Sequence, residues 1–199
     1  MTLEAAEQPT RRYDPNRRDR IIDACLDVIA EVGVAGTSHR KVADAADVPL
    51  GSMTYHFRGM NELRHEAFTR FAVAFSERFA ARMAAAADRA AAVASIVEAV
   101  ESDILNDQRE LVLTQELYTL AARDASFRDI TNAWMGRSRD ALERHFDPAT
   151  ARMLDALIEG LTLHRALDNE PQDDAVVRTA VARITDTRTT DTDTAGENP

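Results

Sequence analysis

At 199 residues, the chain is long enough to bury one sizeable hydrophobic core or two smaller ones. No apolar run approaches the roughly 20 residues that a membrane-spanning helix needs, and the polar N-terminal stretch predicts no signal peptide. The single cysteine excludes an internal disulfide and a cysteine-based zinc site. These features favour a cytoplasmic protein in a reducing setting.

The net charge of −10 counts slightly against a nucleic-acid partner. Residues 1–66 and residues 67–199 each contain more Asp and Glu than Lys and Arg, so neither part is basic. Positive side chains nevertheless gather in the first part: Arg11, Arg12, Arg17, Arg18, Arg20, Arg40, Lys41 and Arg58. Charge alone therefore leaves DNA binding open, and sequence motifs must decide it.

Apolar residues recur at helical spacing along the whole chain, whereas the alternating runs and Asn-Gly turns typical of strands are nearly absent. The sequence therefore predicts an all-α fold. Residues 1–14 lack this periodicity and predict a disordered arm, which is either solvated or reaches for DNA. The first helix is expected to begin at Pro15 and to stop at Gly33, because proline favours a first turn and glycine a helix end. Cys25 lies on its apolar stripe and is expected in the core.

Two short helices follow. Thr37 is the expected N-cap of a helix that runs to about Ala46. Residues 47–48 predict a tight turn, and Pro49 is expected in the first turn of the next helix, which ends near Phe57. Small alanines allow these two helices to cross steeply, as in a helix-turn-helix unit, while the first helix covers its third side.

Longer helices are predicted from Met60 onward. Aromatic residues repeat along the first of them, and further amphipathic segments follow it. Pro148 is expected to open the next-to-last helix, and Pro171 to break the chain before the last one. The polar stretch at the end predicts a disordered tail. The predicted organisation is an arm (1–14), a helix-turn-helix DNA-binding domain (15–59), a larger helical domain (60–186) and a tail (187–199).

Two neighbouring segments carry a specific pattern. Residues 17–33 are RRDRIIDACLDVIAEVG, and residues 36–57 are GTSHRKVADAADVPLGSMTYHF. A first helix ending in Gly, a T-S-x-R-x-V-A-x-A-A helix and a V-P-L-G-S-M-T-Y-H-F helix together resemble the tetracycline-repressor (TetR) family of regulators. The resemblance implies an all-α protein in which a three-helix, helix-turn-helix DNA-binding domain precedes a larger helical ligand-binding and dimerisation domain.

The resemblance also implies DNA contacts around the second and third helices. The hydroxyls of Thr37 and Ser38 are expected to hold phosphates, and short side chains of the third helix to approach base edges in the major groove. Where many family members carry a phosphate-gripping Lys, this chain has Met60, and Arg58 is expected to replace it. The predicted DNA-binding residues are Thr37, Ser38, Arg40, Lys41, Leu50, Gly51, Ser52, Thr54, Tyr55, His56 and Arg58.

In the family, the larger domain holds an inducer pocket and dimerises. Aromatic and polar residues on its helices are the candidate pocket lining: Phe68, Phe71, Phe75, Leu117, Tyr118, Trp134, Arg137 and His164. The last two helices are apolar on more than one face, which predicts a two-fold interface. Its candidate residues are Leu157, Gly160, Leu161, Val177, Val181 and Ile184. A two-fold dimer implies a palindromic operator.

These features predict a homodimeric repressor that binds double-stranded operator DNA and is released by a small-molecule effector. One alternative is a family member that activates, or an accessory protein with a weakened DNA surface. Another is an enzyme or carrier that reuses a helical bundle, but the sequence shows no Ser-His-Asp arrangement, no metal-spaced His/Glu set and no phosphate-binding Gly loop. We therefore expect no catalytic residues, no cofactor, no metal and no membrane partner.

Overall fold

The computed structural model describes residues 14–103, 107–170 and 173–186, and every regular element in these ranges is helical. The predicted all-α class is therefore confirmed for the described residues. The predicted tail and all but the last residue of the predicted arm lie outside them, as does Pro171. None of the described helices is long and apolar enough to cross a membrane.

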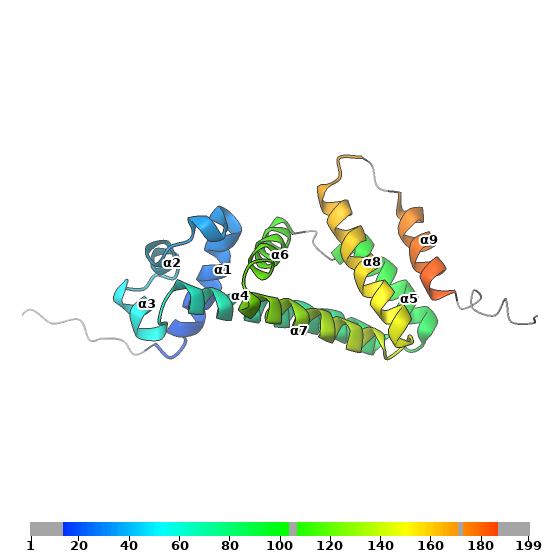
Figure 1. Ribbon diagram of the computed structural model, residues 1–199, viewed down its shortest axis with the longest axis horizontal. Helices are drawn as coiled ribbons and strands as arrows, with labels where there is room; N and C mark the ends of the chain where they lie inside the picture. The colour runs from blue at the N-terminus through cyan, green and yellow to red at the C-terminus, as the bar shows by residue number, and fades with distance from the viewer. Residues whose placement is uncertain (1–13, 104–106, 171–172, 187–199) are drawn as a thin grey trace, which may run out of the picture.

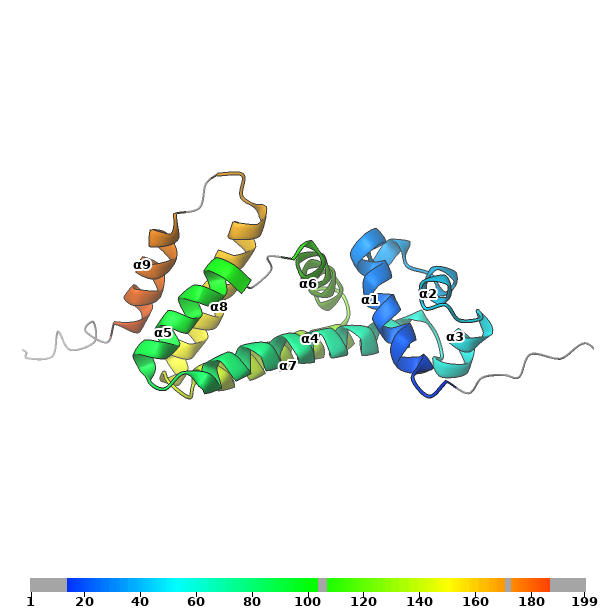
Figure 2. The same cartoon turned by 180° about the vertical axis from the view of Figure 1, so that it is seen from behind.

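The helices form an elongated molecule. In chain order they are α1 (Arg17–Gly36), α2 (His39–Ala45), α3 (Gly51–His56), α4 (Met60–Ala85), α5 (Arg89–Glu98), the π-helical η1 (Ala99–Asp103), α6 (Gln108–Ala121), α7 (Ala125–Leu142), α8 (Pro148–Leu167) and α9 (Asp174–Thr185). Helices α4 and α7 lie side by side along the long axis (Figures 1 and 2). The three N-terminal helices lie at one end, α5, α8 and α9 at the other, and α6 lies between them against α1 and α7.

The break predicted at Gly33 is confirmed. Gly33 has φ 72° and ψ 169°, a conformation that is essentially restricted to glycine, and a last helical turn follows it. The predicted N-cap of α2 is wrong by one residue. Ser38 is the cap and accepts from the Lys41 backbone N–H at 3.4 Å. Thr37 instead closes α1, because its hydroxyl donates to the Gly33 carbonyl at 2.7 Å.

The turn between α2 and α3 lies where the sequence predicted it. Asp47 adopts φ 50°, in the left-handed region that Asp tolerates in turns. Pro49, however, precedes α3 instead of lying in its first turn. Leu50 is the residue before the helix, and the Pro49 carbonyl accepts from the Ser52 N–H at 2.8 Å. The proline thus ends the turn immediately before α3.

Aspartates begin most of the later helices. The Asp147 carboxylate accepts from the backbone N–H groups of Ala149 and Thr150, and Pro148 follows as the first helical residue of α8, as predicted. The same kind of cap begins α5, α6, α7 and α9, at Asp88, Asp107, Asp124 and Asp173. The hydroxyls of Thr150 and Ser126 also donate to Asp147 and Asp124, and these bonds, followed by those from the backbone N–H groups, lower the pKa of both aspartates because they favour the charged form.

The protein buries two hydrophobic cores. The first joins α1, α2 and α3 to the N-terminal half of α4, to α6 and to the N-terminal half of α7. The second joins the C-terminal ends of α4 and α7 to α5, α8 and α9. Cys25 is fully buried in the first core, as predicted. The helices of the predicted DNA-binding domain therefore share a core with helices of the predicted larger domain.

Candidate nucleic-acid interface and internal cavity

Helix α3 presents a protruding outer face. Tyr55 is 84% exposed and Leu50, just before the helix, is 54% exposed. Gly51 and Thr54 lie on the same exposed side, and Gly51 has no neighbouring atom within 4 Å of where a side chain would begin. The inner side is fixed by Met53, which is fully buried. A helix with one buried face and one exposed face, as in α3, suits insertion into the major groove of DNA.

Two of the eleven predicted contact residues are buried. Ser52 is 8% exposed and Thr37 is 6% exposed, so both face the protein and not the outer surface. Ser38, Arg40, Lys41 and Arg58 are exposed, and His56 is half-buried. A shallow hollow lies between the start of α2 and α3, lined by Thr37, Ser38, His39, Arg40, Leu50, Met53, Thr54 and Met60. Nine of the predicted residues are therefore at least partly exposed, and four of these line the hollow: Ser38, Arg40, Leu50 and Thr54.

Two arginines of α1 add positive charge beside this surface. Arg18 lies over the Phe57 ring, 5.0 Å from its centroid, and pairs with Glu66 at 2.5 Å. Burial lowers the pKa of His56, and the charges of Arg17 and Arg18 lower it further. The sequence showed these arginines as part of a positive cluster, but it did not show that they lie close to α3.

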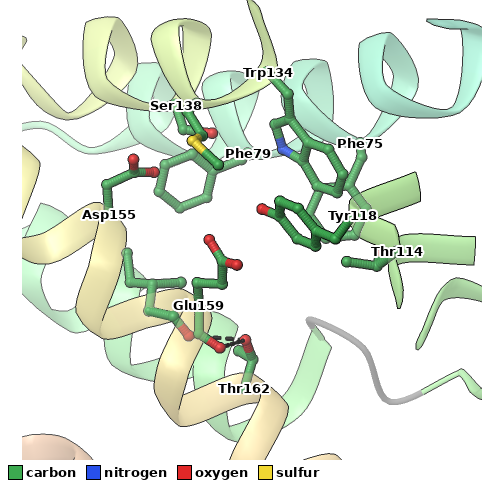
Figure 3. A pocket seen from close by; sticks show the side chains of 11 residues that line it. Phe75, Phe79, Thr114, Tyr118, Trp134, Ser138, Asp155, Glu159 and Thr162 are labelled. Atoms are coloured by element: carbon green, nitrogen blue, oxygen red, sulfur yellow. Dashed lines mark hydrogen bonds between the residues drawn. The ribbon is translucent and has the colours of Figure 1, made fainter. Parts of the chain in front are cut away.

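A cavity lies between α4, α6, α7 and α8. Its enclosed volume is about 70 Å³, and about 570 Å³ of empty space is counted when the side that opens to solvent is included. Eleven residues line it: Phe75, Phe79, Thr114, Tyr118, Trp134, Met135, Ser138, Asp155, Ile158, Glu159 and Thr162 (Figure 3). Trp134 is its centre of aromatic contacts, 4.8 Å from Phe75 and stacked at 6.4 Å on Tyr118, between ring centroids.

Three of the eight predicted pocket residues line this cavity: Phe75, Tyr118 and Trp134. Phe68, Phe71 and Leu117 belong to the first core instead. The Arg137 guanidinium donates to the buried Ser76 hydroxyl at 2.8 Å, and His164 is exposed on α8. An apolar stripe at helical spacing fits a core position and a cavity wall equally well, so the sequence could not separate them.

Two carboxylates that the sequence analysis missed face the cavity from α8. The Glu159 carboxylate points to its middle, beside the Tyr118 hydroxyl, and Asp155 lies one turn earlier (Figure 3). Asp155 pairs with Arg139 at 3.2 Å. Burial raises the pKa of Asp155, although the Arg139 charge opposes this shift. Burial also raises the pKa of Tyr118, as do the charge of Glu159 and its hydrogen bond to the phenol.

The predicted dimer residues divide into two groups. Val177 and Val181 are buried in the second core of their own chain, so the structure assigns them an internal role. Leu157, Leu161 and Ile184 are half-buried against the same core, and Gly160 is exposed. Other apolar side chains of α8 and α9 are bare: Met153 at 49%, Leu167 at 60% and Val176 at 56% exposure.

An exposed helix-turn-helix at one end, joined to a larger set of helices that encloses a cavity, is the layout of a DNA-binding regulator. The comparisons with known proteins agree. Residues 21–67 match the family model described as "Bacterial regulatory proteins, tetR family". Residues 84–187 match the model described as "Tetracyclin repressor-like, C-terminal domain". The chain belongs to the TetR family of transcription regulators, which are DNA-binding proteins and not enzymes.

Solved structures support the same assignment. SCO7518 of Streptomyces coelicolor A3(2), described as a transcriptional regulator, is 56% identical with a TM-score of 0.82; the match covers 87% of this chain and 100% of that one. The multidrug binding protein EbrR, complexed with ethidium, is 35% identical with a TM-score of 0.73, covering 86% and 99%. SCO1917, a TetR family member from Streptomyces coelicolor A3, is 35% identical with a TM-score of 0.72, covering 85% and 98%. No curated protein matches the chain.

Proposed function

We propose that this regulator is a homodimeric repressor, acting in the cytoplasm, that leaves a palindromic operator when a small molecule occupies the cavity. The DNA surface consists of Ser38, Arg40, Lys41, Leu50, Gly51, Thr54, Tyr55, His56 and Arg58, with Arg17 and Arg18 beside it. Exposed hydroxyl and cationic groups hold phosphates, while the outer face of α3 reads bases. The buried Thr37 and Ser52 are left out of this surface.

The observation that carries this proposal is that the cavity is built on helices that also support the DNA-binding unit. Helix α4 lines the cavity with Phe75, and its Arg64 donates to the carbonyls of Val34 and Thr37 at 3.1 and 3.3 Å. Those two carbonyls flank the turn between α1 and α2. A displacement of α4 by a ligand therefore reaches the start of α2 directly.

Helix α6 provides a second connection. Its Tyr118 lines the cavity, while its Arg109 donates to the Asp27 carboxylate of α1 at 2.7 and 3.0 Å. Release of DNA then follows as a population shift. The ligand binds the form of the dimer whose two α3 helices no longer fit successive major grooves more tightly than it binds the DNA-bound form. The complexes of EbrR with ethidium, proflavin and malachite green support a cavity of this kind as the site of aromatic ligands.

For the dimer, we propose the bare face of α8 and α9. Met153, Gly160 and Leu167 lie along one exposed side of α8, and Val176 lies on α9. Together with the half-buried Leu157, Leu161 and Ile184, they form an apolar face that a second copy covers. A two-fold axis there places the two α3 helices in successive major grooves, roughly 34–36 Å apart or more.

The operator is identified by selection. The purified full chain is incubated with a pool of random duplexes, and the enriched sequences are read after several rounds. We expect a palindrome, and an affinity that falls steeply with rising salt because phosphate contacts release counterions. Failure to enrich any palindrome refutes the proposal.

Release is then measured with proflavin, by the anisotropy of a labelled operator. The matched control is Met135→Trp, which fills the cavity without touching the DNA surface. We expect release from the parent protein and not from the variant. Equal release from both indicates an effect on the DNA itself and contradicts release through the cavity.

A further inference from the structure

The polar groups of the cavity are more specific than an apolar ligand requires. Most of the wall is aromatic or aliphatic, but Glu159, Asp155 and Thr114 interrupt it. Thr114 is buried and Asp155 is half-buried, whereas Glu159 is exposed. A buried polar group needs a partner, and an exposed carboxylate beside a cavity attracts cations, so the arrangement of the three indicates what the cavity holds. The inference drawn from them rests on the proposed function, because it concerns the chemical class of the effector.

The ionisable side chains that line the cavity, taken with the Arg139 that pairs with one of them, sum to a charge of −1 when they carry their ordinary charges. Asp155 is balanced by Arg139 at 3.2 Å. Among the described residues, no Lys, Arg or His nitrogen lies within 4.0 Å of the Glu159 carboxylate, which faces the neutral Tyr118 phenol (Figure 3). A single positive charge on a ligand therefore completes the balance, whereas a negative charge meets Glu159 directly.

The aromatic walls favour the same ligand. Phe75, Trp134 and Tyr118 form one cluster, with Trp134 at 4.8 Å from Phe75 and 6.4 Å from Tyr118. Aromatic rings attract cations to their faces and pack well against flat ring systems. A delocalised aromatic cation packs on these rings and balances the charge of Glu159 at the same time.

Thr114 supplies an independent observation. It is 5% exposed, lines the cavity from α6, and its Oγ1 has no hydrogen-bond partner. Helical threonines usually bond back to their own helix, as Thr69 and Thr162 do at 2.7 and 2.8 Å. Figure 3 shows the Thr114 oxygen directed to the cavity and not to the helix. The hydroxyl is thus left for a ligand group.

We infer that the effector is an aromatic monocation that carries at least one primary amino group on its ring system. Its ring system packs on Trp134 and the neighbouring aromatic side chains, and its charge lies next to the Glu159 carboxylate. Its N–H donates to Thr114 Oγ1, on the opposite side of the cavity. Glu159 selects the sign of the charge, and Thr114 distinguishes primary amines from their alkylated analogues.

Binding is measured on the full chain without DNA, through the fluorescence of Trp134. Trp134 is the only tryptophan of the chain and lies in the cavity wall, so its quenching reports occupancy. The charge test uses proflavin as the cation, N-phenyl-1-naphthylamine as a neutral probe, and 8-anilinonaphthalene-1-sulfonate as its anionic counterpart. We expect proflavin to bind at least about tenfold more tightly than the sulfonate, the scale of one charge-assisted contact.

Glu159→Gln keeps the shape of the side chain and removes its charge. It should weaken proflavin about tenfold, strengthen the sulfonate, and leave the neutral probe within about twofold. Glu143→Gln, which removes a charge from the exposed end of α7, should change none of the three. An unchanged proflavin affinity in Glu159→Gln, or a sulfonate that binds the parent protein as tightly as proflavin, overturns the inference.

Thr114→Val removes only the unpartnered hydroxyl. It should weaken proflavin about threefold, as expected for one neutral hydrogen bond, while acridine orange, which carries dimethylamino groups instead, should change less. Thr119→Val, at an exposed position of the same helix, is the matched control. A thermal unfolding midpoint that is raised or unchanged in Thr114→Val shows that the fold is intact. Equal weakening of proflavin and acridine orange binding by Thr114→Val contradicts the role of Thr114.

These outcomes are separable from those of the proposed function. If proflavin binding depends on Glu159 but no small molecule releases the operator, the ligand class stands and effector release fails. If operator release depends on the cavity but not on Glu159, the ligand class fails alone.

Discussion

Replacement of Gly33 by alanine is expected to destabilise the protein at the contact between α1 and α6. Gly33 adopts φ 72° and ψ 169°, where a side chain costs about 1–3 kcal/mol. An added Cβ also lies 2.6 Å from Oε1 of Glu116 on α6. Because that oxygen is the end of a flexible side chain, the backbone contribution should dominate. For a chain of this length, we expect a midpoint of thermal unfolding lowered by roughly 4–8 °C for about 2 kcal/mol.

The assay is thermal unfolding followed by circular dichroism, at one fixed protein concentration because an associating protein changes its midpoint with concentration. Gly136→Ala is the matched control, since Gly136 lies within α7 with nothing within 4 Å of a new Cβ. It should raise stability by up to about 1 kcal/mol, the helix propensity difference. The double variant Gly33→Ala, Glu116→Ala removes the contact but not the strain. A midpoint for Gly33→Ala equal to that of the parent refutes the reasoning, and full rescue by Glu116→Ala refutes the dominance of the backbone.

Three other predictions concern the surfaces. Tyr55→Ala should weaken operator binding about three- to tenfold, as for one lost hydrogen bond, with no change in thermal midpoint because Tyr55 is 84% exposed; a lowered midpoint contradicts this. Gly160→Arg should convert the dimer to a monomer in sedimentation equilibrium, whereas Ala133→Arg, exposed on α7, should not; a dimeric Gly160→Arg contradicts the proposed interface. Since the fold lowers the pKa of His56, the folded state without DNA should lose stability as pH falls below about 6.5. DNA phosphates favour the protonated ring, so operator affinity should rise over the same pH interval. An identical pH dependence in His56→Gln refutes that assignment.

The sequence predicted local features well because their signals are local. A glycine in a conformation closed to other residues breaks α1 one turn before its end, and a proline after an aspartate cap begins α8. The DNA-binding unit was predictable for the same reason, since α1, α2 and α3 are contiguous and the motif that fixes their crossing lies within residues 17–57, most of which the family match at 21–67 covers. The error at Thr37 and Ser38 arose because two adjacent hydroxyl residues are both good caps, and only the Gly33 carbonyl decides between them.

The cavity was not predictable to the same degree, because its wall joins four helices that are distant in sequence. Asp155 and Glu159 are four residues apart on an amphipathic helix, which is also the pattern of a solvated charged face. Val177 and Val181 were assigned to the dimer because an apolar stripe does not reveal whether it faces its own core or a second copy. Only the packing of α9 on α5 and α8 decides that these valines face inward.

The shared first core constrains how a ligand signal reaches α3. The pair between Arg109 and Asp27 is largely exposed, with 40% and 65% of the side chains accessible, and exposed pairs contribute little. The position of α6 on α1 is therefore set by buried residues such as Leu113 and Leu117, which pack in the same core as Ile21 and Met53. A close-packed core resists small distortions, so a ligand that moves α6 must shift α1 with it instead of deforming the contact between them. The pair between Arg109 and Asp27 then fixes the register of α6 on α1, and the apolar contacts transmit the movement of α6 to α1.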